Sequence, residues 1–266
     1  MNILEVKKIC SELGIQPSKK LGQNFLVNEI VCCKIVDECI DDNISNIIEI
    51  GPGLGALTRD LINIDKPFSV IELDNKLAKY WQERGVEVEH IDALKFPWQE
   101  KIKEKTLVVS NLPYQISSSI VVELSLVPHV SKMVFMFQKE VAQRIKANKG
   151  GKDYGLLSII AQSYWQITKL VDVPPRAFYP PPKIDSRVLV FQRLENTEFC
   201  NKDFINFVKL AFSHRRKLLS KNLKEYRDEM VVKNAFNRLG LNEKIRAEQL
   251  SVDEFQRLYL ELKNEH

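Results

Sequence analysis

Short runs of β-forming residues alternate with helical stretches from residue 46 to residue 194. Strands that alternate with helices are typical of a mostly parallel sheet with helices on both faces. The runs are 46–50, 68–73, 86–92, 106–111, 132–138, 169–174 and 187–194. Only "PPRAFYPPPKIDS" separates the last two. This connection is too short for a covering helix, so we expect an antiparallel pair there. The sequence therefore predicts an α/β fold.

The pattern changes near residue 195, beyond which the chain reads as helical. Phe204, Phe207 and Val208 recur at helical spacing, and Ala211 continues the series. Further on, "SVDE" opens with Ser251 and carries Glu at its fourth position, which is the pattern of a capping box. We expect two domains, residues 1–195 and residues 196–266, of which the second is small and all-α.

Composition restricts the location of the protein and its partners. The 266 residues carry a net charge of +4, which permits a nucleic-acid partner without requiring one. No apolar run approaches the roughly 18 residues of a membrane span, and "MNILEVKKIC" lacks the apolar core of a secretory signal. The five cysteines include no CxxC pair, which argues against a disulfide framework and a thiolate metal site. We expect a cytoplasmic protein with no membrane contact and no metal.

Polar residues end four of the predicted strands. These residues are Glu49, Glu72, Asp92 and Asn111. The first strand runs directly into "GPGLG", which begins at Gly51, and the later strand ends follow at steps of about one βα unit. The carboxyl ends of parallel strands meet at one edge of the sheet, where open α/β sheets bind ligands. The sequence predicts a ligand cleft at this edge.

The residue types in this cleft indicate an adenosine-containing cofactor. Glu72 is placed to accept both hydroxyls of a ribose, although a charge at a helix N-terminus is the alternative role, and Asp74 could fill that role equally well. Asp92 can accept from an adenine amino group or cap the next turn. The GxGxG spacing after Glu49 suits a sulfonium cation better than a pyrophosphate, which favours S-adenosylmethionine over a dinucleotide.

The stretch "NLPY" then has a chemical explanation. The amino nitrogen of adenine is a weak nucleophile, because its lone pair is delocalised into the ring. The side-chain oxygen of Asn111 and the backbone carbonyl of Leu112 are candidate acceptors for its hydrogens, and Pro113 fixes the turn. Tyr114 can stack on the base. This arrangement predicts methyl transfer to an adenine amine, catalysed by positioning.

Nine motifs in order resemble the ribosomal RNA adenine dimethyltransferase family, from about Lys19 to beyond Lys217. They are "KKLGQNFL", "EIGPGLGALT", "VIELD", "HIDAL", "NLPYQIS", "FQKEVAQRI", "YGLLS", "VPPRAFYPPPKIDSRV" and "AFSHRRK". The chain is most similar to the housekeeping group, which dimethylates two adjacent adenosines near the 3′ end of small-subunit rRNA. The resemblance implies a Rossmann-like methyltransferase sheet of seven strands and a small C-terminal helical domain.

The resemblance also implies roles for individual residues. Asn24 and Leu26 would contact the methionine part of the cofactor, and Gly51 would line its pocket. Glu72 would hold the ribose and Asp92 the adenine. Asn111 would lie where the methyl group meets the target amine. Tyr114 would stack on the target adenine, and Phe178 or its neighbour Tyr179 would close the other face. Gln115 departs from the family, which often has Asn at this position.

Two basic stretches fit an RNA backbone, although a solvated helix face is the alternative. The residues are Lys139, Arg144, Lys146, Lys149 and Lys152 in the first stretch, and Arg215, Arg216, Lys217, Lys221 and Lys224 in the second. We expect small-subunit rRNA in a pre-ribosomal particle as the partner and a monomeric protein. Phosphate contacts position the RNA but do not read its sequence.

Other readings share parts of this evidence. A large-subunit rRNA dimethylase that confers antibiotic resistance has the same chemistry, but "LGQNFL" and "PPPKIDS" favour the housekeeping group. A non-catalytic assembly or transcription factor would lack the asparagine of "NLPY" or the cofactor acids, which are present here. Duplex DNA as acceptor would indicate a DNA adenine methyltransferase. A nicotinamide enzyme fits neither the glycine spacing nor "NLPY".

Overall fold

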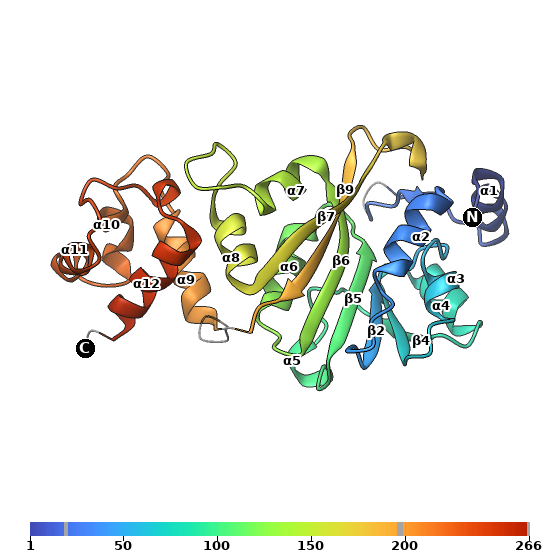
Figure 1. Cartoon of the computed structure of the whole chain (residues 1–266). Coiled ribbons are helices and arrows are strands. Elements are labelled where there is room, and N and C mark those ends of the chain that lie inside the picture. The colour runs from blue at the N-terminus through green and yellow to red at the C-terminus, as the bar shows by residue number, and fades with distance from the viewer. Residues whose placement is uncertain (19–20, 196–198, 200, 265–266) are drawn as a thin grey trace. The chain divides into compact units, whose positions relative to one another are not determined.

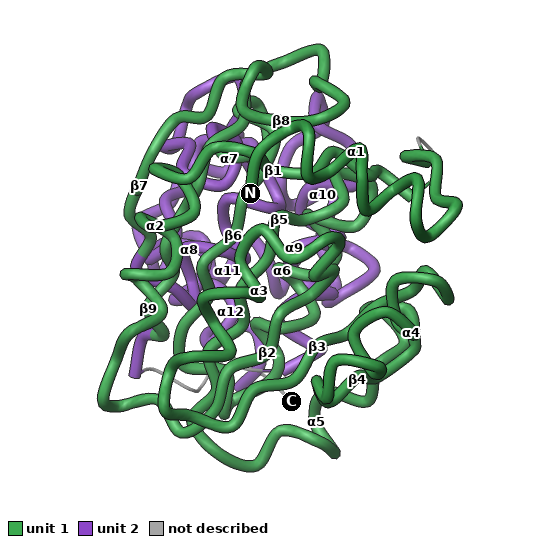
Figure 2. Tube along the Cα trace, turned by 90° about the vertical axis from the view of Figure 1, so that its right-hand side faces the viewer, with its two compact units in different colours: residues 1–142, 167–193 green, residues 143–166, 194–266 purple. Residues whose placement is uncertain are grey.

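The computed structural model describes residues 1–18, 21–195, 199 and 201–264 (Figure 1). Lys19, where the family resemblance begins, and Cys200, one of the five cysteines, lie outside the described residues. The chain divides into two compact units, shown in different colours in Figure 2. Unit 1 comprises residues 1–142 and 167–193, and unit 2 comprises residues 143–166 and 194–266.

This division differs from the single boundary expected at residue 195. One break falls close to it, after Arg193, but residues 143–166 group with the C-terminal helices. They do so because helix α8 (Leu156–Tyr164) packs on α9 (Lys202–Ala211) and α12 (Val252–Lys263). The two-domain reading with a boundary at residue 195 remains a prediction.

A seven-stranded sheet forms the centre of unit 1. Its strand order is β4-β3-β2-β5-β6-β9-β7. The bounds are β2 Asn46–Ile50, β3 Phe68–Glu72, β4 Glu87–His90, β5 Thr106–Asn111, β6 Val130–Gln138, β7 Trp165–Val173 and β9 Ser186–Arg193. Neighbours from β4 to β6 pair in parallel, and β9 pairs antiparallel to β6. The predicted mostly parallel α/β sheet is confirmed.

Helices of unit 1 cover both faces of the sheet. They are α1 Ile3–Glu12, α2 Glu29–Asp37, α3 Thr58–Leu61, α4 Asn75–Gln82, α5 Trp98–Lys101 and α6 Ser117–Ser125, and α7 Lys139–Ile145 begins in this unit. One hydrophobic cluster joins α2 and α3 to alternate strand residues such as Leu107 and Val109. Phe135 and Phe191 pack on the opposite face, and Figure 1 shows α2 and α6 on opposite sides of the sheet.

A second, very small sheet was not predicted from the sequence. Strands β1 (Phe25–Leu26) and β8 (Phe178–Tyr179) pair antiparallel, with Leu26 opposite Phe178. The 3-10 helix η1 (Pro175–Ala177) leads into β8. The pair joins "QNFL" to "AFYPP", two segments that the sequence places far apart.

In the described residues of unit 2, the regular structure is helical except for the first residues of β7, as expected for the C-terminal segment. Besides α8, α9 and α12, unit 2 contains α10 Leu219–Asn222 and α11 Glu229–Arg238, with the 3-10 helices η2 Leu223–Glu225 and η3 Ala247–Gln249. Aromatic rings fill its core: the centroids of Phe204 and Tyr259 lie 5.1 Å apart. The predicted capping box is present, because the Ser251 side chain accepts from the Glu254 amide and the Glu254 carboxylate accepts from the Ser251 amide.

Membrane insertion finds no support in the described part of the chain, where no helix combines the length and apolar character needed to cross a bilayer.

Candidate active site

A cavity of about 440 Å³ lies at the carboxyl ends of β2, β3 and β5 in unit 1. This volume is in the range of small-molecule sites. Every residue predicted to contact the cofactor lines it: Asn24, Leu26, Gly51, Glu72, Asp92 and Asn111. Residues that are distant in the sequence therefore lie around one cavity, as the positions of the strand ends predicted. Pro113 and Gln115, in and just after "NLPY", also line it.

The glycine-rich turn requires glycine for two different reasons. Gly51 has φ +67°, and a Cβ placed there would meet no atom within 4 Å. The backbone thus leaves open space beside the cavity, which lets a ligand approach closely. Gly55 has φ +92° and packs against Trp81, whose ring would lie 2.6 Å from an added Cβ. The Trp81 indole also donates to the Gly53 carbonyl at 2.9 Å, which holds the turn on α4.

Glu49 is a buried carboxyl in the floor of the cavity. It is 2% exposed and accepts a hydrogen bond of 2.7 Å from the Thr58 hydroxyl. Burial raises the pKa of Glu49 to about 8. A cation beside this carboxyl would favour its charged form, as expected for the neighbour of a sulfonium. Thr58 is a supporting residue that the sequence analysis missed.

The two candidate roles for the acids after β3 are divided between two residues. Asp74 caps α4, because its carboxylate accepts from the Lys76 amide at 2.9 Å. Glu72 instead lines the cavity and accepts from the Asp74 amide at 2.8 Å. Burial raises the pKa of Glu72 to about 7. A ribose with two hydroxyl donors would supply partners that this buried carboxylate needs.

Asp92 combines both of its candidate roles. One carboxylate oxygen accepts from the Leu94 amide at 2.9 Å, which closes a turn after β4. The side chain is half-buried and lines the cavity, so its second oxygen remains available as an acceptor for a ligand amine.

Asn111 has an orientation fixed by a long-range hydrogen bond. Its side-chain Nδ2 donates to the backbone carbonyl of Asn24 at 3.0 Å. This bond to the "QNFL" segment orients the amide, so that its oxygen, Oδ1, is left as an acceptor for a ligand. Leu112 is buried at 2% exposure, whereas Pro113 lines the cavity. The arrangement places an oriented amide acceptor in the lining of a cofactor-sized cavity.

Comparison with protein families supports this chemistry. The family model of ribosomal RNA adenine dimethylase matches residues 15–264. The chain belongs to the ribosomal RNA adenine dimethylase family. It is therefore an rRNA adenine dimethyltransferase that depends on S-adenosylmethionine, which confirms the predicted enzyme class and cofactor.

Individual relatives cover nearly the whole dimethylase chain. A ribosomal RNA small subunit methyltransferase A from Bdellovibrio bacteriovorus is 47% identical, over 93% of this chain and 93% of that protein. The same-named protein of Desulfitobacterium hafniense is 41% identical over 91% of each chain. The crystal structure of a dimethyladenosine transferase from Plasmodium falciparum matches with a TM-score of 0.76 at 25% identity, covering 90% of this chain and 97% of that one. The predicted Rossmann-like methyltransferase fold is confirmed.

The aromatic residues assigned to the target base do not line this cavity. Tyr114 is half-buried, and its hydroxyl lies 2.9 Å from that of Ser186. Phe178 is 2% exposed and belongs to the same hydrophobic cluster as Leu26. Tyr179 is half-buried, with the Lys7 ammonium 5.4 Å from its ring centroid. Stacking of Tyr114, Phe178 or Tyr179 on a target adenine stays a prediction.

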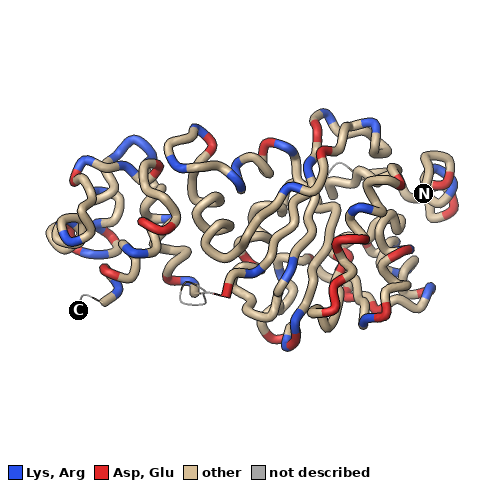
Figure 3. The backbone as a smooth tube through the Cα atoms, in the orientation of Figure 1, with Lys and Arg blue, Asp and Glu red and all other residues tan. Residues whose placement is uncertain are grey.

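Six basic residues predicted to contact RNA lie in unit 2, whereas Lys139 of the first stretch lies in unit 1 and pairs with Asp185. The six are Arg144, Lys146, Arg215, Arg216, Lys217 and Lys221, and all are exposed. The structure joins the two stretches, because Arg215 donates to the Lys152 carbonyl at 2.6 Å. Lys221 is less available, since it pairs with Glu229 at 2.7 Å. Figure 3 shows Lys and Arg in blue along the chain, including the run between α9 and α10.

Metal ligation has no support in the described residues, where no group of three His, Cys, Asp or Glu side chains could hold an ion.

The raised pKa of Glu49 predicts how stability depends on pH. Folded protein keeps a proton on this carboxyl up to about pH 8, whereas the unfolded chain releases it near the ordinary value of 4.5. Its stabilising contribution is thus complete below pH 4.5 and is lost as pH rises through about 8. We expect the free energy of unfolding without cofactor, measured with urea, to fall across this window by up to about 1.4 kcal/mol per pH unit.

Glu49→Gln should make this dependence less steep by the share of Glu49, because the amide keeps a hydrogen-bond acceptor for Thr58 but does not titrate, while Glu72 still does. Glu83→Gln is the matched control, since the Glu83 carboxylate is exposed in a surface pair with Lys79. An unchanged slope in Glu49→Gln would show that Glu49 titrates normally in the folded protein.

Proposed function

We propose that this chain dimethylates the exocyclic amino groups of two adjacent adenosines near the 3′ end of small-subunit rRNA. The observation that carries the proposal is the Asn111 amide, held by the Asn24 carbonyl in the lining of the cavity. An amide acceptor beside a methyl donor suits an amine nucleophile. The small-subunit methyltransferases that are 47% and 41% identical support the choice of rRNA.

The cavity residues fit S-adenosylmethionine group by group. The bound cofactor supplies an electrophilic methyl group on a sulfonium. Glu72 holds the ribose hydroxyls, and Asp92 accepts from the adenine amine of the cofactor. Gly51 leaves room for the ligand beside the backbone. Glu49 provides a carboxyl that a neighbouring cation would ionise. Asn24 and Leu26 contact the methionine part, a role that their place in the cavity lining supports.

The "NLPY" turn prepares the target amine. Oδ1 of Asn111 and the Leu112 carbonyl accept its two hydrogens, which draws the nitrogen toward a tetrahedral shape and frees its lone pair. Little is then required of a general base, because the nitrogen loses its proton readily once it has been methylated. Tyr114 stacks on the base and keeps the amine in line with the donor. Phe178 closes the other face, with Tyr179 as the alternative.

Small-subunit rRNA is preferred over large-subunit rRNA as the substrate. The similar small-subunit proteins cover more than nine-tenths of the chain. A 23S rRNA methyltransferase, ErmE, matches as a structure with a TM-score of 0.65 at 24% identity, which is a likeness of fold alone. Methylation assays with small subunits, large-subunit rRNA and duplex DNA as competing acceptors separate the three readings. Preferred labelling of either alternative acceptor would reject the proposal.

We further propose that the protein acts as a cytoplasmic monomer on a pre-ribosomal particle. The exposed basic residues of unit 2 hold the RNA backbone, because phosphate contacts need cations without requiring sequence readout. The joined stretches around Lys152 and Arg215 offer a continuous set of such cations.

The basic residues predict a defined salt dependence of RNA binding. In the double variant Arg216→Ala with Lys217→Ala, we expect affinity for small-subunit rRNA to fall about tenfold at moderate salt. The slope of log affinity against log salt should become shallower by about 1 to 2, because two phosphate contacts are lost. Fluorescence anisotropy over a salt series measures both quantities.

Lys8→Ala is the control for this experiment, since Lys8 is an exposed cation of unit 1 in a weak pair with Glu12. An unchanged salt slope in the double variant would contradict a phosphate-binding role for these residues.

A further inference from the structure

Tyr114 makes hydrogen bonds at its backbone and at its hydroxyl group. The Ser117 hydroxyl donates to the Tyr114 backbone carbonyl at 2.9 Å. At the far end, the phenol oxygen lies 2.9 Å from the hydroxyl of Ser186. A ring with two rotatable bonds that is tied at its backbone and at its tip has little freedom to turn. Ser186 belongs to the "KIDSRV" motif, to which the catalytic scheme assigns no role.

Ser186 itself is held in place by the end of the sheet. It is fully buried, at 0% exposure, and pairs with Gln138 in the ladder between β6 and β9. The ladder continues one step further, because the Lys139 amide donates to the Asp185 carbonyl at 2.9 Å. The partner of the Tyr114 hydroxyl is therefore part of rigid sheet structure rather than of a free loop.

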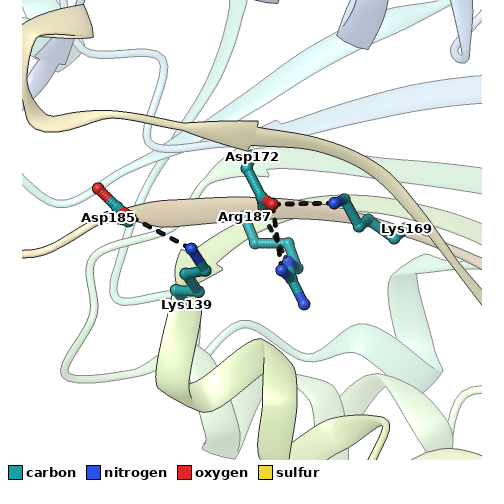
Figure 4. Close-up of polar contacts among 5 residues, drawn as sticks. All are labelled: Lys139, Lys169, Asp172, Asp185 and Arg187. Atoms are coloured by element: carbon teal, nitrogen blue, oxygen red, sulfur yellow. Dashed lines mark hydrogen bonds and ion pairs between the residues drawn. The ribbon is translucent and has the colours of Figure 1, made fainter.

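Ion pairs secure the residues on either side of Ser186 (Figure 4). Arg187 donates two hydrogen bonds to Asp172, from Nε to Oδ1 at 2.6 Å and from Nη2 to Oδ2 at 3.1 Å. Paired bonds of this kind add geometric specificity as well as energy. Lys169 also reaches Asp172, at 2.8 Å, and the two cations hold the pKa of Asp172 well below its usual range. On the other side, Lys139 and Asp185 form a weaker exposed pair at 3.3 Å.

We propose that Ser186 is a positioning residue for methyl transfer, which fixes the Tyr114 ring through the hydroxyl–hydroxyl bond. The inference rests on the proposed function, in which that ring stacks on the target adenine. An anchored ring offers the base one defined plane, so the amine is delivered to Asn111 in a reproducible orientation. The Tyr114 hydroxyl then has a structural role. Burial raises the pKa of this group, so it stays protonated and can donate.

A double-mutant cycle tests the pair. Tyr114→Phe and Ser186→Ala each remove one side of the bond, and each should lower the single-turnover rate of methyl transfer about fivefold. The double variant should be no slower than either single variant, because the two changes remove the same interaction. The affinity for S-adenosylmethionine should not change in any of the three, since neither side chain lines the cofactor cavity.

Ser125→Ala is the matched control. Its hydroxyl is also fully buried, but it donates to the Val121 carbonyl at 2.7 Å within α6. This variant reports what the loss of a buried serine hydroxyl does to stability alone, and its rate should equal that of the unchanged protein. If the rate losses multiply in the double variant, or if Ser186→Ala keeps the full rate, the inference is wrong.

Tyr114→Ala separates this inference from the proposed function. If loss of the whole ring leaves the rate unchanged, the stacking role in the proposed function fails. If Tyr114→Ala strongly lowers the rate of methyl transfer while Ser186→Ala leaves it unchanged, the ring acts on the base without its hydrogen bond to Ser186, and only the inference fails.

Discussion

Replacing Asn111 with alanine is expected to lower the rate of methyl transfer by about 10³-fold, the scale of losing one preorganised hydrogen-bonding group at a reacting centre. Oδ1 of Asn111 is one of two acceptors proposed for the hydrogens of the target amine. Without it, only the Leu112 carbonyl remains, and the nitrogen keeps its planar, unreactive form. The loss should appear in single-turnover measurements with saturating cofactor and RNA, where it reflects chemistry rather than binding.

Asn111→Ala should leave the fold intact, because the side chain is half-buried and lines a cavity. Circular dichroism and the thermal midpoint check this point. Asn63→Ala is the control, since the Asn63 side chain only donates to the Arg59 carbonyl on an exposed surface. Turnover at the unchanged rate in Asn111→Ala would remove Asn111 from the mechanism.

The second large effect concerns the cofactor. Glu72→Gln should weaken binding of S-adenosylmethionine about 10²-fold, because two hydrogen bonds from the ribose to a charged acceptor become bonds to a neutral one. The variant keeps the shape of the side chain and an oxygen for the Asp74 amide. Titration calorimetry measures the change directly.

The same carboxyl gives binding a pH dependence of known sign. The pKa of Glu72 is raised to about 7 in the free protein, and the ribose hydroxyls require the charged form. The Glu72 carboxyl should thus make affinity fall below pH 7 by up to about tenfold per pH unit, and Glu72→Gln should lose this part of the pH dependence. Glu87→Gln, an exposed acid in β4, is the control. A Glu72→Gln variant that binds as tightly as the unchanged protein would overturn the ribose assignment.

The meeting of these residues at one cavity could be predicted largely from the sequence, for a topological reason. Glu72 and Asn111 each end a strand of a parallel sheet, and Asp92 follows the end of β4 by two residues, so their spacing along the chain determines that they meet at one edge. Gly51 was equally visible, because a glycine-rich turn after a strand is a local signal. Each of these predictions uses only the sequence within a single βα unit.

Contacts between distant segments could not be predicted in this way. The bond from Asn111 to the Asn24 carbonyl spans 87 positions, and the two-residue strands β1 and β8 are too short to carry a periodic pattern. The burial of Phe178 follows from its pairing opposite Leu26, which no local motif shows. Residues 143–166 join the C-terminal helices through tertiary packing of α8, whose own sequence resembles any other apolar helix.

The most direct test of the account identifies the methylated nucleoside and its position. Purified protein is incubated with radiolabelled S-adenosylmethionine and undermethylated small ribosomal subunits, and the RNA is then digested and mapped. The account predicts dimethyladenosine at two adjacent positions near the 3′ end of the small-subunit rRNA, and its absence in Asn111→Ala. If no label appears although the cofactor and the subunits both bind, the chain is a non-catalytic assembly factor on this fold and the account is contradicted.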